Sequence, residues 1–124
     1  MFLSDSIIYK VVLSLRSQQI VLLPKGTTIL SCKIQKMQPC VWFMLPFESV
    51  KSENLERHAF MMIETGTKFK NMPTNAKFLT TLDHDGAILH VFHAVFENVE
   101  DAKTDTLRGE SVGIDSFYPR EGSA

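Results

Sequence analysis

The sequence has little of several features that would assign a function class directly. Lys and Arg number 13 against 14 Asp and Glu, and the resulting net charge of −1 lacks the basic excess of duplex-binding proteins. The apolar N-terminus is interrupted by Asp5, Lys10 and Arg16 within a span too short for a membrane helix. We therefore expect a cytoplasmic protein that binds no membrane, and we do not expect it to bind nucleic acid.

Cysteine is also scarce, since Cys32 and Cys40 are the only two. Two cysteines do not form a disulfide framework, and no signal peptide indicates an oxidising compartment. The two lie across an expected turn, on adjacent strands, and we expect reduced thiols in the core. At 124 residues the chain has room for one domain with one core.

Extended segments dominate the chain from residue 6 to residue 96. Residues 6–15 alternate, with one face formed by Ile7, Tyr9, Val11 and Leu13. A polar stretch at 16–18 predicts a hairpin turn into the strand 19–23, which Pro24 ends. In residues 28–35 the set Thr28, Leu30, Cys32 and Ile34 is expected to be buried, and the apolar run 40–45 is typical of a central strand.

The second half of the chain repeats this pattern. Residues 57–64 favour a strand, although a helix would also suit these residue types. Residues 65–75 form a long polar loop of the kind that carries function in compact domains. Asp85-Gly86 between the apolar runs 77–82 and 87–96 predicts a hairpin.

These elements predict a mainly β protein, a small antiparallel barrel or sandwich of six to eight strands. Residues 1–96 are expected to form the β domain. Residues 97–124 are expected to form an extension, as a short C-terminal helix or an extended tail.

Several short motifs lie along the chain: Ile8-Tyr9-Lys10, Leu23-Pro24-x-Gly26, Ile29-Leu30-Ser31, Pro39-Cys40-x-Trp42, Thr65-Gly66, and Gly86-x-x-Leu89-x-x-x-His93 with Phe92 nearby. In these motifs the chain resembles a family of short phage and prophage proteins of unknown function. The chain departs from the family where Thr67-Lys68 replaces a His-Pro pair, and its tail from Glu97 lies outside the resemblance. The resemblance implies a small β fold and a phage origin, and it carries over no catalytic residue. With a phage origin, the expected location is the cytoplasm of the host cell.

The residue types would allow two kinds of reactive site, a metal site and a cysteine nucleophile. His84, His90 and His93 lie close together in the sequence with Asp83 and Asp85, but alternation along a strand sends His90 and His93 to opposite faces. A Cys32 or Cys40 nucleophile beside His58 or His90 would need an activated thiolate, and no local motif indicates one. We therefore expect no metal, no cofactor and no enzymatic activity.

Cationic side chains beside aromatic rings form the third candidate, a site for a small phosphorylated, base-containing ligand. A cation binds phosphate while a ring stacks on the base. The expected ligand-binding residues are Arg57, Lys68, Lys70, Arg108, Phe117, Tyr118 and Arg120. Ordinary solvated positions remain the alternative interpretation of these residues.

The chain carries more large apolar side chains than a sheet of a few short strands can bury. The set comprises Phe2, Leu3, Phe43, Met44, Phe47, Met61, Met62 and Met72. A symmetric homo-oligomer would cover part of it. The function we expect is that of a phage accessory protein that sequesters a small nucleotide signal of antiviral defence. The alternative is an interaction module that inhibits a host enzyme.

Overall fold

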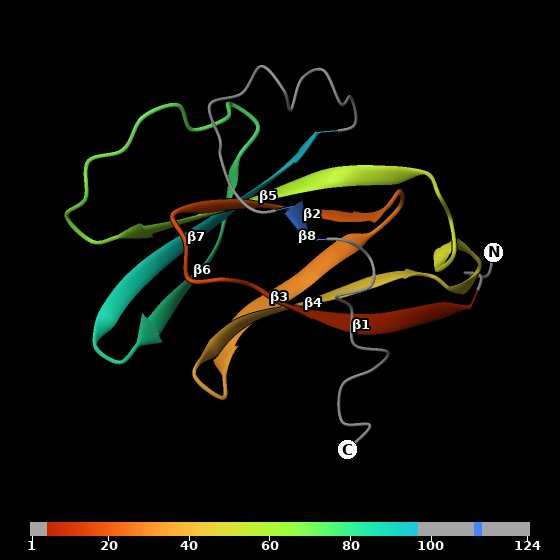
Figure 1. Cartoon of the computed structure of the whole chain (residues 1–124), viewed down its shortest axis with the longest axis horizontal. Helices are drawn as coiled ribbons and strands as arrows, with labels where there is room; N and C mark the ends of the chain where they lie inside the picture. The colour runs from red at the N-terminus through yellow and green to blue at the C-terminus, as the bar shows by residue number, and fades with distance from the viewer. Residues whose placement is uncertain (1–4, 97–110, 113–124) are drawn as a thin grey trace.

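The structure is a computed structural model that describes residues 5–96 and 111–112 (Figure 1). Within these residues the chain forms strands and one short 3-10 helix. In chain order they are β1 (Ser6–Val12), β2 (Gln18–Pro24), β3 (Thr28–Gln35), β4 (Gln38–Pro46), η1 (Phe47–Ser49), β5 (Leu55–Glu64), β6 (Lys77–His84), β7 (Ala87–Phe96) and β8 (Ser111–Val112).

The strands form two sheets, and the prediction of a mainly antiparallel β fold is confirmed. One sheet has the order β1-β4-β3, and the other has the order β6-β7-β5-β2-β8. All pairings are antiparallel except that of the two-residue β8 with β2. Figure 1 shows the sheets as separate layers, and because they do not close into a barrel the architecture is a sandwich.

The core lies between the two sheets and is built by two-residue alternation. Val41, Phe43 and Leu45 of the central strand β4 are almost fully buried, and Phe60 of β5 lies in the same cluster. The expected inner face of residues 6–15 is confirmed, since all four of its apolar residues belong to this cluster or pack against it. Inward side chains on both layers exclude water from one continuous apolar interior.

The expected hairpin between residues 6–15 and 19–23 is wrong. β1 pairs with β4 in one sheet, whereas β2 pairs with β5 in the other, so the chain crosses between the layers at residues 13–17. The buried Gln19 stabilises this crossing because its amide donates to Ser14 O at 2.7 Å and its carbonyl accepts from Ser14 N at 3.0 Å. A polar turn in a sequence indicates a reversal, but it does not say whether the next strand stays in the same sheet.

The expected inner face of residues 28–35 needs a second correction. The register of β3 against β4 shifts between Ile29 and Ser31, which marks a β-bulge. Ile29 therefore packs against the core, while Leu30 is 43% exposed. An extra residue in one strand reverses the alternation on one side of it, and strict periodicity cannot anticipate this.

The hairpin at Asp85-Gly86 is confirmed between β6 and β7. Both residues have positive φ, at 52° and 91°, as the central pair of a type I′ turn requires. Gly86 N also donates to the Asp83 carboxylate at 2.9 Å.

Only Ser111 and Val112 of the predicted extension are described, as β8. The expected helix and the domain boundary at residue 96 therefore stay predictions, because the remaining residues lie outside the described ranges. Within those ranges no helix is long and apolar enough to cross a membrane.

Candidate functional site

A pocket lies on the outer face of the larger sheet, beneath the loop formed by residues 65–76. The start of β2, the end of β5 and this loop supply its walls. Its lining residues are Ser17, Gln18, Met61, Met62, Ile63, Thr67, Lys68, Phe69, Lys70, Asn71 and Met72. We call it the loop pocket.

Apolar contacts fix the C-terminal half of the loop to the sheet. Met72 and Ala76 pack against an outer-face cluster that includes Met61 and Ala94, and the Asn75 amide donates to Val95 O at 3.0 Å. The other half of the loop begins at a turn in which Thr67 N donates to Glu64 O at 3.0 Å. Residues 67–71 span the gap between these two anchors and form the outer wall of the pocket.

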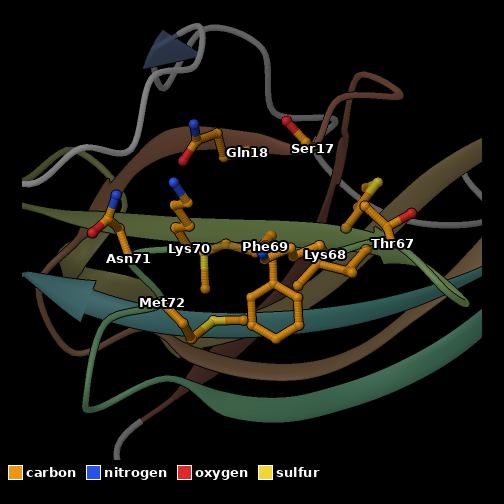
Figure 2. A pocket seen from close by; sticks show the side chains of 11 residues that line it. Ser17, Gln18, Thr67, Lys68, Phe69, Lys70, Asn71 and Met72 are labelled. Carbon is orange, nitrogen blue, oxygen red and sulfur yellow. The ribbon is translucent and has the colours of Figure 1, made fainter.

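The lining combines cations, a ring and hydrogen-bonding groups above an apolar floor. Figure 2 shows the Phe69 ring and Met72 on one side of the pocket, with the Lys70 ammonium group pointing to the other side, where Gln18 lies. The pocket volume is about 240 Å³. This falls below the range of about 300–1,000 Å³ that is typical of small-molecule sites. The pocket of one chain is therefore smaller than a typical small-molecule site.

The structure brings together two of the predicted ligand-binding residues. Lys68 and Lys70 both line the loop pocket. Arg57 does not, because it lies four positions before Met61 on β5, a separation of about 13 Å along a strand. Its Nε is buried without a hydrogen-bond partner among the described residues. Four predicted residues lie outside the described ranges, namely Arg108, Phe117, Tyr118 and Arg120.

Sequence reasoning missed the opposite wall of the loop pocket. Ser17 and Gln18 line it from β2 and the segment before it, about fifty positions earlier than the loop lysines. Nothing local in the sequence links these segments, because their contact depends on the pairing of β2 with β5. The visible signal was the length and polarity of the loop itself.

A histidine pair, His58 buried and His93 half-buried, lies on the inner face of the larger sheet. His58 Nδ1 and His93 Nε2 are 2.8 Å apart, and the two rings are nearly parallel, at 18°, with centroids 5.1 Å apart. His58 is 1% exposed, and its Nε2 has no hydrogen-bond partner among the described residues, although Glu56 Oε1 lies 3.6 Å away. Sequence reasoning did not find this pair because its members are on strands β5 and β7 that meet only in the fold.

Burial sets the protonation of these histidines and of a core thiol. It lowers the pKa of His58 to about 3, with a smaller contribution from His93, and lowers the pKa of His93 to about 4. Burial, and secondarily the nearby Cys40, raises the pKa of Cys32 to about 12. Both cysteines are free and buried, so Cys32 is a neutral thiol at physiological pH and a poor nucleophile.

The other histidines do not combine with this pair. His90 points to the outer face, where Thr65 Oγ1 is 2.8 Å from its Nε2 and Thr81 Oγ1 is 3.1 Å from its Nδ1. His84 Nε2 lies 3.0 Å from Met37 O. In the described part of the chain no three metal-ligating side chains cluster, and the predicted separation of His90 from His93 is confirmed.

Comparison with known protein families assigns the chain to a family. The profile of a domain of unknown function (DUF7352) matches residues 5–102. The chain belongs to this family. No curated protein and no solved structure matches it. The family covers the whole described sandwich up to the end of β7, and it supplies no activity for either site.

Proposed function

We propose that this protein is a non-enzymatic binding protein that holds a small nucleotide-type ligand in the loop pocket. The observation that carries the proposal is the convergence of Lys68, Phe69 and Lys70 on one cavity with hydrogen-bonding groups from β2. The lysines bind phosphate, and the ring stacks on a base. Gln18 and Asn71 would contact the polar edge of the ligand.

The fine structure of the loop supports binding rather than packing. The Phe69 side chain is 54% exposed although the loop is anchored to the sheet on both sides of it. A large exposed ring between two cations gains free energy both by leaving water and by contact with a planar partner. The exposed ring thus supports a ligand with a π face.

The physiological role that we propose is sequestration of a nucleotide signal of antiviral defence by a phage accessory protein. This role rests on the resemblance to phage proteins, and the site is proposed to be completed in a homo-oligomer. The pocket of one chain is smaller than a typical small-molecule site, so a second chain would supply further contacts, with Arg108, Phe117, Tyr118 and Arg120 as the proposed residues. Arg57 is proposed to contact such a neighbour and not the pocket itself.

Titration calorimetry with a panel of cyclic and ADP-ribose-type nucleotides tests the proposal. We expect saturable binding to the wild type and an affinity about tenfold lower in Lys68→Ala and in Lys70→Ala, since each removes one charge-assisted contact. Lys51→Ala, at an exposed lysine outside the loop pocket, is the matched control. Absence of heat with every nucleotide, or equal effects of the three variants, would overturn it.

Native mass spectrometry of freshly purified protein tests the oligomer separately. We expect a symmetric assembly that retains a small ligand with ultraviolet absorbance. A monomer without retained mass would contradict the proposed shared site.

The second candidate is an interaction module that inhibits a host enzyme. Phe47 and Phe78 are each 59% exposed, and β1, β3 and β6 are edge strands of their sheets among the described residues. Apolar side chains beside an open strand edge suit the addition of a partner strand. A stoichiometric host protein recovered with the tagged chain, and lost in Phe47→Ser or Phe78→Ser, would favour this candidate.

A further inference from the structure

We propose a second ligand site, between the two sheets, for a small acid that carries both a negative charge and a proton to donate. The site is a cavity of about 460 Å³ where β3 approaches β6 and β7. It lies at the β6 edge of the larger sheet, where the exposed Phe78 also lines it, and it shares no lining residue with the loop pocket. The proposal is therefore independent of the proposed function.

Two polar side chains of this cavity are direct neighbours. Lys77 of β6 pairs with His93 of β7 in the antiparallel register, and both line the cavity. Cβ atoms of directly opposite residues lie about 5 Å apart, on the same face of a sheet. The exposed Lys77 and the half-buried His93 thus line the same volume, whose apolar walls include Ile29 and Leu79, and the lysine side chain can reach an anion bound beside the imidazole.

The chain of groups behind His93 determines its tautomer. A glutamate carboxylate only accepts hydrogen bonds, and Glu56 Oε1 lies 3.6 Å from His58 Nε2. A distance of 3.6 Å is too long for a hydrogen bond. A lone pair on His58 Nε2 would nevertheless be repelled by the lone pairs of the carboxylate, whereas an N–H at this position would be attracted. The proton of His58 is therefore on Nε2, and His58 Nδ1 accepts from the Nε2–H of His93 across 2.8 Å.

His93 Nδ1 is left with a lone pair as a consequence. His93 is neutral near physiological pH because burial lowers its pKa to about 4. The cavity therefore offers a hydrogen-bond acceptor at His93 and a cation at Lys77. A monoprotonated phosphate, or a phosphate monoester that keeps one proton, satisfies both groups, whereas a fully deprotonated anion would place its own lone pairs against His93 Nδ1.

Nitrogen-15 NMR of the imidazole groups tests the tautomer and the ligand together. The probes are inorganic phosphate, which at about pH 6 still carries protons that it can donate, and sulfate, which carries none. We expect the free protein to show His93 protonated on Nε2. We also expect phosphate to shift the Nδ1 resonance saturably, while sulfate leaves it unchanged.

Variants assign the response to this cavity. Lys77→Ala changes an exposed residue and is expected to weaken phosphate binding about tenfold, and His93→Gln to abolish discrimination between phosphate and sulfate. Lys68→Ala, in the loop pocket, is expected to change nothing. A His93 proton on Nδ1, equal responses to the two anions, or a response unaffected by Lys77→Ala would each overturn the proposal.

Discussion

The two faces of β5 carry the same kinds of residue but are covered in different ways. On the inner face Phe60 and Met62 lie in the main core, under the opposite sheet. On the outer face Met61 is covered by Met72 from the loop 65–76. A sheet-covered face can be exposed only by unfolding, whereas a loop can open locally at a smaller cost in free energy. The inner face therefore determines stability, and the outer face is free to adapt to a ligand.

The largest effect that this comparison predicts is at Phe60, which is fully buried on the inner face. Phe60→Ala removes a large side chain from a close-packed core and is expected to lower the free energy of unfolding by about 4 kcal/mol. Urea denaturation followed by tryptophan fluorescence measures it. A loss below about 1 kcal/mol would show that the sandwich interior is loosely packed.

Acid is expected to destabilise the same face. The native-state pKa values of His58 and His93 lie below the ordinary value of 6.5, so the unfolded chain binds protons that the native pair resists. Their stabilising contribution is fully present above about pH 6.5, is lost progressively below it, and is gone once the pH has fallen through the native values of about 4 and 3.

We expect a loss of roughly 3 kcal/mol for each histidine of the pair between neutral pH and pH 4. Denaturation midpoints in a pH series measure it, with His93→Gln as the comparison. An equally steep pH profile in that variant would attribute the effect to other groups.

A smaller effect is expected at Met72, which is half-buried between the loop and the outer face. Met72→Ala is expected to cost about 1 kcal/mol, because only part of its apolar surface leaves water on folding. Hydrogen exchange of residues 67–71 is expected to accelerate more than exchange in β5. Uniform acceleration across the sheet would mean that the two faces are not separable.

The smallest effect on stability is expected at Phe69. Its exposed ring contributes little to folding, so Phe69→Ala should change the free energy of unfolding by less than about 0.5 kcal/mol. The same variant should weaken nucleotide binding about tenfold if the ring stacks on a base. Calorimetry of ligand binding beside thermal denaturation separates the two quantities. Unchanged affinity would remove the stacking contact from the proposed function.

The sequence predicted the features that depend on neighbouring residues. Alternation placed the strands, and Asp85-Gly86 located the hairpin because both residues tolerate positive φ. The loop was identified from its length and polarity, and with it Lys68 and Lys70. What failed depends on contacts between distant segments: the crossing at residues 13–17, the bulge that exposes Leu30, and the meeting of His58 with His93.

The pairing order of the strands has a practical consequence for the loop 65–76. Every strand of the smaller sheet precedes this loop, and the hairpin β6–β7 follows it, attached to the rest by the antiparallel ladder of β7 with β5. An isolated two-stranded hairpin is at best marginally stable in water, so the β6–β7 fragment would fold only when it pairs with β5 of the other fragment. A chain divided between Lys70 and Asn71 would thus yield two complementary fragments that reassemble, and because both fragments line the loop pocket, the ligand proposed for this pocket would favour their reassembly.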